Sequence, residues 1–232
     1  MGSVFRFKQF AVEQSGAKMK IGTDGVLLGA WADCSGATRI LDIGTGTGVI
    51  ALMMAQRSEA DYIVGIDIDP SATLCAESNF EASPWASRLR TVNSSAQEFE
   101  EQNFDLILSN PPYFTDSLLC PDVRRSMARH TTELTFDQLD SAVCRALSIP
   151  DGRFALILPT EQMDKYLSLT SLKLRRRCDV STKPNTPPKR TMAELALQAG
   201  EVEYSTLTID TQVHGIYTDQ YRELTKDFYL KF

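Results

Sequence analysis

The sequence predicts an α/β fold, in which a doubly wound, mostly parallel sheet of seven strands has helices on both faces. Apolar runs of strand length alternate with segments of helix length over most of the chain, which is the pattern of parallel strands joined by helical crossovers. A glycine-rich turn at residues 44–48 follows the first core strand, and Asp67 lies at the end of the next one. Ligands of such folds bind outside the carboxyl ends of the strands, so these residues mark the edge where a site is expected.

The N-terminal segments precede this alternation. Residues 4–14 alternate apolar and polar side chains at Phe5 and Phe7, which predicts a short strand or a hairpin arm. Residues 22–32 predict a helix with Thr23 or Asp24 as its N-cap. We expect a single domain over residues 1–232, in which residues 1–38 form an arm and a capping helix and residues 39–232 form the core.

The core elements follow from periodicity and from turn residues. Strands are expected over residues 38–44, 61–69, 88–93, 104–110, 153–159, 173–180 and 193–199. Helices are expected over residues 47–58, 70–80, 135–148, 160–172 and 217–232. Pro70 stands at a first helical position with Asp69 as the cap before it.

Composition excludes several classes of protein. No apolar run approaches the roughly 20 residues of a membrane-spanning helix, and the first residues lack the apolar region of a signal peptide. The five cysteines are scattered and form no C-x-x-C pair, so neither a zinc site nor a disulfide framework is indicated. We expect a cytoplasmic protein without a metal, and we expect it to be a monomer.

Charge is unevenly distributed along the chain. The net charge is −6, but residues 165–190 contain eight Lys or Arg and one acid, a net of +7, which leaves −13 for the rest. This asymmetry predicts a basic face that contacts nucleic acid, and an exposed edge strand protected by charge is the alternative. The candidate contacts in this stretch are Arg175, Arg176, Arg177, Lys189 and Arg190.

The glycine turn and Asp67 predict a nucleoside site. Gly44, Gly46 and Gly48 allow the backbone to approach a ligand where a Cβ atom would clash. Asp67 lies 25 residues after Asp42, where a carboxylate can accept both hydroxyl groups of a ribose. The turn also satisfies a loose G-x-G-x-x-A pattern, so a nicotinamide dinucleotide is an alternative ligand, and a turn without a ligand is another.

The strand over residues 104–110 ends in the sequence NPPY. The prolines have no backbone N–H, so the strand cannot continue, and the residue before a proline is held extended. The amide oxygen of Asn110 and the carbonyl of Pro111 can then accept two hydrogen bonds from one planar NH₂ group, while Tyr113 offers a stacking face. Two such acceptors stabilise positive charge that develops on the nitrogen during nucleophilic attack. A simple Asn-Pro turn with a packed tyrosine is the alternative.

These stretches carry a family resemblance. The segments LDIGTGTGVI, GIDID and SNPPYF resemble the motifs of class I S-adenosylmethionine-dependent methyltransferases, which have a Rossmann-like fold. The segments MKIGTDGVLLGAWA, SPWASRL, ARHTTEL and FYLKF are similar to those of the bacterial tRNA1(Val) (adenine-37 N6)-methyltransferase family. The resemblance implies methyl transfer from S-adenosylmethionine to N6 of adenine 37 in the anticodon stem-loop of a valine tRNA.

The resemblance also implies roles for individual residues. The expected cofactor contacts are Thr23, Asp24, Asp42, Gly44, Gly46, Gly48, Asp67, Ile68, Ser95 and Asn110. The expected contacts with the target adenine are Asn110, Pro111 and Tyr113. Ser95 departs from the family pattern, which has an acid there; its neutral hydroxyl can still accept a bond from the cofactor's exocyclic amine, but a charge-assisted contact is lost.

Other functions remain open on sequence alone. A protein-glutamine N5-methyltransferase also uses NPPY, but such enzymes carry an N-terminal helical domain, and the first core strand here starts near Ile40. A guanine-N2 ribosomal RNA methyltransferase and an inactive RNA-binding module are the further alternatives. Arg124, Arg125 and Arg129 are candidate phosphate contacts, with a solvated charged loop as the alternative.

Overall fold

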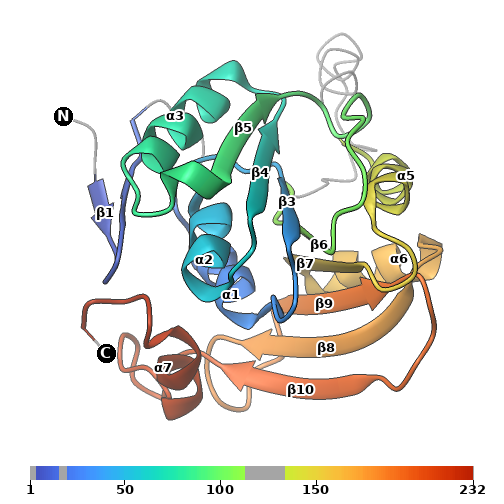
Figure 1. Ribbon diagram of the computed structural model, residues 1–232. Coiled ribbons are helices and arrows are strands. Elements are labelled where there is room, and N and C mark those ends of the chain that lie inside the picture. The colour runs from blue at the N-terminus through green and yellow to red at the C-terminus, as the bar shows by residue number, and fades with distance from the viewer. Residues whose placement is uncertain (1–3, 16–19, 113–133, 232) are drawn as a thin grey trace, which may run out of the picture.

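The computed structural model describes residues 4–15, 20–112 and 134–231, and a large twisted sheet forms its centre (Figure 1). The strands are β3 (Arg39–Ile43), β4 (Tyr62–Asp67), β5 (Leu89–Asn93), β6 (Leu106–Ser109), β7 (Arg153–Pro159), β8 (Lys173–Ser181), β9 (Arg190–Ala196) and β10 (Glu203–Thr208). Within the described residues this sheet has eight strands in the order β10-β8-β9-β7-β6-β3-β4-β5. Strand β9 is antiparallel to both neighbours, and the other pairs are parallel.

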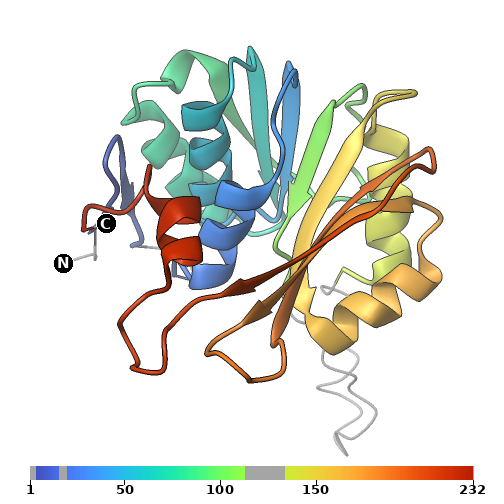
Figure 2. The same cartoon turned by 90° about the horizontal axis from the view of Figure 1, so that it is seen from below.

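Helices cover both faces of the sheet, as Figure 2 shows. One face packs against α1 (Thr23–Trp31), α2 (Val49–Arg57), α3 (Pro70–Glu81) and α7 (Asp219–Thr225), and the other against α5 (Phe136–Ala146) and α6 (Thr160–Leu169). A short 3₁₀ helix, η1 (Ala86–Arg88), precedes β5, and β1 (Val4–Arg6) pairs with β2 (Ala11–Glu13) as an antiparallel hairpin. In the part of the chain that the structure describes, no helix has the length and apolarity needed to cross a membrane.

The central strands are buried on both sides because helices cover both faces. Ile40 of β3 and Ile63 of β4 belong to the apolar core under α1 and α2. Their neighbours in sequence, Leu41 and Val64, belong to the core under α5 and α6, since successive strand residues point to opposite faces. This continuous burial explains why these strands are uninterrupted apolar runs in the sequence.

The α/β prediction is confirmed, but the main sheet has eight strands within the described residues, where seven were predicted. The additional strand is β10, which pairs in parallel with β8. The first four residues of β10 are exposed, so the sequence has no alternation of apolar and polar side chains there. That alternation is the pattern that predicts a half-buried strand. The last helix is also shorter than the predicted 217–232, because α7 spans Asp219–Thr225.

The predicted cap of the first helix is wrong. The N-cap residue is Gly22, in extended geometry, and no side chain caps the helix. The Asp24 carboxylate instead accepts a hydrogen bond from Nε of Arg190 at 2.8 Å. The cap before Pro70 is confirmed, because Oδ1 of Asp69 accepts the Ser71 N–H at 2.9 Å.

Candidate active site

Three neighbouring strands bring the central candidate residues to one edge of the sheet. The glycine turn follows β3, Asp67 ends β4 and Asn110 follows β6, and these strands are adjacent in the order β6-β3-β4. The backbone N–H groups of Gly44 and Thr45 both donate to the carbonyl of Ile66 at 2.9 Å. These two hydrogen bonds hold the glycine turn against the end of β4, next to Asp67.

The glycine turn needs its glycines for two different reasons. Gly44, Gly46 and Gly48 have φ angles of 74°, 57° and 81°, in the left-handed region that favours glycine. At Gly48 an added Cβ atom would also lie 2.5 Å from Cε1 of Phe80, inside the core. At Gly44 the position of an added Cβ is open space, so a ligand can approach the backbone there.

The Asp67 carboxylate is held in a fixed orientation. Its Oδ2 atom accepts the Gly46 N–H at 3.0 Å, and its Oδ1 atom accepts the Asp69 N–H at 2.9 Å. A carboxylate has about four acceptor sites, so these two bonds leave capacity for further donors such as hydroxyl groups. The side chain is only partly buried, and it stands at the end of β4, where a ribose is expected.

Asp42 lies fully buried beneath the glycine turn. Its Oδ2 atom accepts the hydroxyl of Thr45 at 2.7 Å, while Oδ1 has no hydrogen-bond partner among the described residues. Burial raises the pKa of Asp42 to about 7. The Thr45 hydroxyl and the backbone N–H of Ala51 oppose this shift, and the nearby Asp67 carboxylate adds to it. A buried carboxylate oxygen without a donor is suited to a positively charged or N–H-bearing ligand group.

Two further predicted cofactor contacts have different surroundings. Ile68 is 55% exposed directly after β4, so it presents an apolar surface at the site edge. The Ser95 hydroxyl is engaged locally, because it donates to Oε2 of Glu98 at 2.9 Å and accepts the Glu98 N–H at 3.3 Å. Arg145 of α5 fixes the same turn by donating to the carbonyls of Ala96 and Phe99.

Asn110 lies against the first turn of α1. A Cβ atom added at Gly25 would be 3.8 Å from Nδ2 of Asn110 and 3.5 Å from Cγ1 of Val49. Thr23 and Asp24 stand directly before Gly25 at the start of the same helix. Among the described residues none makes a hydrogen bond to the Asn110 amide, so its acceptor is available to a ligand. Four of the predicted site residues, Tyr113, Arg124, Arg125 and Arg129, lie outside the described part of the chain.

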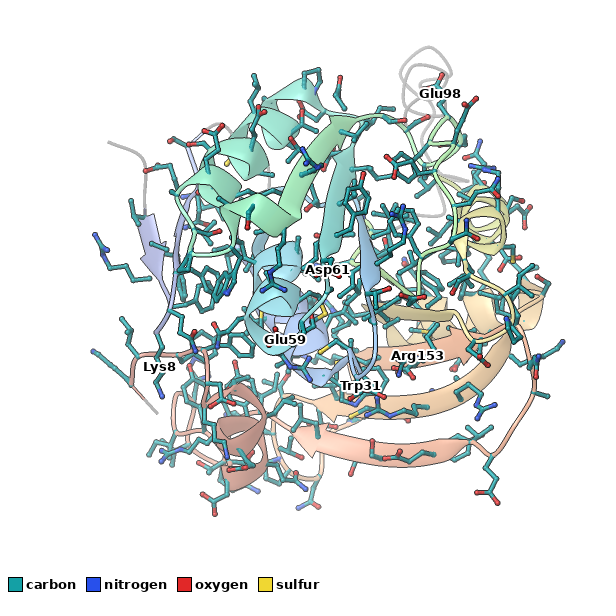
Figure 3. The ribbon with its side chains drawn as sticks, in the orientation of Figure 1. Lys8, Trp31, Glu59, Asp61, Glu98 and Arg153 are labelled. Atoms are coloured by element: carbon teal, nitrogen blue, oxygen red, sulfur yellow. The ribbon has the colours of Figure 1, made fainter. Side chains whose placement is uncertain are left out.

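The predicted RNA-contact residues divide into two groups. Arg176 forms ion pairs with Glu194 and Glu203, and its guanidinium group lies over the ring of Trp31. This group is near the amino ends of β7 and β8, in the region where Figure 3 labels Trp31 and Arg153. Arg177 pairs with Asp164 and Asp179, while Arg175 lies beside them on β8.

Lys189 and Arg190 lie at the opposite end, where β9 begins at the carboxyl edge of the sheet. Only these two of the five stand on the same edge as Asn110. Across the described residues no group of three or more His, Cys, Asp or Glu side chains can hold a metal ion.

Asn79 also shapes the site, although it was not among the residues predicted from the sequence. Asn79 of α3 is buried, and its Nδ2 donates to the carbonyls of Thr47 at 2.9 Å and Glu13 at 3.0 Å. Its Oδ1 accepts the Glu13 N–H at 2.8 Å, so one side chain joins the glycine turn to strand β2. A single asparagine in a helix has no sequence pattern that indicates this role.

Comparison with known proteins identifies the family of this chain. Residues 15–135 match the model of the Methyltransferase small domain family. The tRNA1(Val) (adenine(37)-N6)-methyltransferase of Parabacteroides distasonis is 46% identical, and the alignment covers 98% of each chain. The protein of the same name from Phocaeicola vulgatus is 45% identical, with 97% of each chain covered.

The chain belongs to the tRNA1(Val) (adenine(37)-N6)-methyltransferase family.

Solved structures confirm the fold of this family member. A predicted O-methyltransferase of Agrobacterium tumefaciens superposes with a TM-score of 0.67 at 16% identity, over 88% of this chain and 96% of that one. The 16S rRNA N2 G1207 methyltransferase of T. thermophilus, solved with AdoMet and guanosine, gives 0.58 at 18% identity over 85% of this chain and 50% of that one. At these identities the likeness concerns the fold alone.

Proposed function

We propose that this protein transfers a methyl group from S-adenosylmethionine to N6 of adenine 37 in a valine tRNA, as the names of its relatives say of them. The observation that carries the proposal is the placement of Asn110 beside the glycine turn and Asp67, on three adjacent strand ends. This arrangement provides an amide acceptor for a planar NH₂ group next to a place for a nucleoside cofactor.

The residues present fit S-adenosylmethionine, which supplies an electrophilic methyl group when bound. Asp67 would accept the ribose hydroxyls, because its orientation is already fixed by Gly46 and Asp69. The exposed side chain of Ile68 would cover one face of the cofactor's adenine. Asp42 would complement the amino group of the methionine moiety, since its Oδ1 atom is buried without a donor.

The chain's own contribution to chemistry is positioning and charge stabilisation. The oxygen of the Asn110 side chain and the carbonyl of Pro111 would accept the two hydrogens of the adenine N6 group, and Tyr113 would stack on its ring. These acceptors favour the geometry with a localised lone pair on nitrogen and stabilise the positive charge that develops there. A methylated amine is acidic while cationic, so water can take its proton and no strong base is required.

Substrate shape also favours a nucleotide of the anticodon loop. A base inside a duplex must be flipped out at a cost of a few kcal/mol, whereas a loop nucleotide is already unpaired. Lys189 and Arg190 lie on the same edge as Asn110 and would contact RNA phosphates there. Binding to tRNA should therefore weaken with increasing salt.

The deciding experiment offers labelled S-adenosylmethionine to purified valine tRNA and to the same tRNA with guanine in place of adenine 37. We expect incorporation only into the first, with N6-methyladenosine identified by nucleoside mass spectrometry. Equal incorporation into both, or transfer only to a protein or to ribosomal RNA, would contradict the proposal.

A further inference from the structure

A cavity of about 750 Å³ lies beside the candidate active site. Its walls come from β1, the start of α1, the ends of β8 and β10, α7 and the C-terminal residues. Figure 2 shows the connection between β8 and β9 and the segment between β10 and α7 on the same lower side of the sheet. Gly44, Gly46, Gly48 and Asp67 are not among the described residues that line it, so it is separate from the cofactor turn.

The cavity and the candidate active site share the first turn of α1. Thr23 and Asp24 line the cavity, and the next residue, Gly25, packs near Asn110. The Asp24 carboxylate forms an ion pair with Arg190 at 2.8 Å, and both residues belong to the cavity wall. One helical turn therefore borders both the cavity and Asn110.

The charge of the cavity wall suits a phosphate. The wall contains two acids. Asp24 forms an ion pair with Arg190, and Oδ2 of Asp210 lies 2.8 Å from Nδ1 of His214. Three further cations also line it, namely Arg6, Lys189 and Lys231, and all three are exposed. Over residues 4–15, 20–112 and 134–231 these three side chains form no ion pair, so the wall has a net positive charge.

Aromatic rings form the other part of the wall. Phe5, Tyr217, Tyr221 and Tyr229 line the cavity together with apolar side chains such as Ile209 and Leu230. Tyr221 is buried, and its ring centroid lies 5.0 Å from that of Tyr217, which is only partly buried. Tyr217 therefore packs against a buried aromatic ring.

We infer that this cavity binds a nucleotide that flanks the target adenosine, with its base against Tyr217 and its phosphate at Lys189. The inference rests on the proposed function and adds a second RNA contact to it. Unpaired bases of an RNA loop stack readily on aromatic side chains, while lysine and arginine hold their phosphates. The volume lies within the 300–1,000 Å³ range typical of small-molecule sites, which accommodates a nucleotide.

The steady-state test compares cavity variants with matched controls on valine tRNA. Stacking of one base contributes about 1–3 kcal/mol, so Tyr217→Ala should raise the KM for tRNA by roughly 5- to 150-fold. Lys189→Ala should also raise this KM. It should make the negative slope of log affinity against log salt less steep, by about 0.7 to 0.9. Both variants should keep the wild-type Kd for S-adenosylhomocysteine within about twofold, because the cavity is separate from the cofactor turn.

The controls are chosen from the other end of the same strands. Tyr204→Ala removes an exposed tyrosine of β10, and Lys173→Ala removes an exposed lysine at the opposite end of the β8–β9 hairpin from Lys189. Neither should change the KM for tRNA. Lys189 is exposed, so its replacement tests the cavity even if Tyr217→Ala unfolds the protein.

A direct readout uses tRNA that carries 2-aminopurine immediately 5′ or immediately 3′ of the target adenosine. We expect wild-type protein to quench the fluorescence of one of these two bases by stacking, and Tyr217→Ala to lose the quenching. If wild-type protein methylates the tRNA but quenches neither base, and Lys189→Ala behaves as Lys173→Ala, the cavity does not hold a flanking nucleotide. If wild-type protein does not methylate the tRNA at all, the proposed function fails instead.

Discussion

The carboxylate of Asp67 accepts a hydrogen bond from the backbone N–H of Gly46 at 3.0 Å. The acid that ends β4 therefore also holds the glycine turn that follows β3, although 21 residues separate the two in sequence. Its second oxygen accepts the Asp69 N–H at 2.9 Å, which directs the chain into α3. One side chain thus fixes the shape of the glycine turn and has acceptor capacity left for a ligand.

Replacing Asp67 with alanine should weaken binding of S-adenosylhomocysteine by roughly ten- to a hundredfold. The loss of a charged hydrogen bond to the ligand costs about 1.5–3 kcal/mol. The glycine turn also loses the hydrogen bond from the Gly46 N–H to the Asp67 carboxylate. Isothermal titration calorimetry measures the Kd of both proteins. Asp69→Ala is the matched control, because Asp69 caps α3 through the Ser71 N–H and should affect stability more than binding. An unchanged Kd for Asp67→Ala would exclude the ribose role.

Replacing Asn110 with alanine should reduce turnover on tRNA by a hundredfold or more and leave cofactor binding nearly intact. The substitution removes an acceptor aimed at charge that develops only in the transition state, and comparable single deletions cost about 10²–10³ in rate. Ser109→Ala is the control, since the Ser109 hydroxyl donates to the Ile43 carbonyl at 2.9 Å inside the core. That change should cost about 1 kcal/mol of stability with little effect on turnover. The two-acceptor account is wrong if folded Asn110→Ala loses less than tenfold in turnover.

Asp42 should make the stability of the apo protein decrease between about pH 4 and about pH 7. Its pKa in the folded state is about 7 and its ordinary value is 3.8, so the folded state binds the proton more tightly than the unfolded state does. The contribution of this group is therefore most favourable below pH 4, falls as the pH rises towards 7, and is constant above it. The slope is at most about 1.4 kcal/mol per pH unit.

Urea unfolding of wild-type protein and Asp42→Asn at a series of pH values measures this effect. The free energy of unfolding of the wild type, minus that of the variant, should decrease from pH 4 to pH 7. The variant is the proper reference because an amide keeps the size of the side chain and does not titrate. A difference that does not change with pH would show that Asp42 is ionised throughout this range.

Replacing Gly48 with alanine should destabilise the protein more than replacing Gly36. Both glycines have left-handed φ angles, 81° and 70°, so each substitution costs about 1–2 kcal/mol in backbone strain. At Gly48 the new Cβ atom would also meet Cε1 of Phe80 at 2.5 Å, whereas the corresponding position at Gly36 is open space. Denaturant unfolding should show the larger loss for Gly48→Ala, and only this variant should bind S-adenosylhomocysteine more weakly. Equal losses of stability would mean that Phe80 moves aside at little cost.

The sequence by itself determined the features that depend on neighbours along the chain. The alternation of strands and helices, the cap formed by Asp69 before Pro70 and the glycine turn are all local patterns, and the structure has each of them. The positions of Asp67 and Asn110 at strand ends also follow from local periodicity, and parallel strands then place both at one edge. These features account for the fold class and for the part of the candidate site nearest the glycine turn.

Only the tertiary structure decided the features that depend on residues far apart in sequence. The Asp24 carboxylate meets Arg190 across 166 positions, so it does not cap its own helix. Asn79 joins the glycine turn to β2, and β10 completes the sheet without an apolar pattern because it is an exposed edge strand. Strand pairing also separates the basic stretch, leaving Lys189 at the site edge while Arg176 is ion-paired with Glu194. Each of these outcomes depends on which surfaces pack together in space, and no periodicity within a single segment records that information.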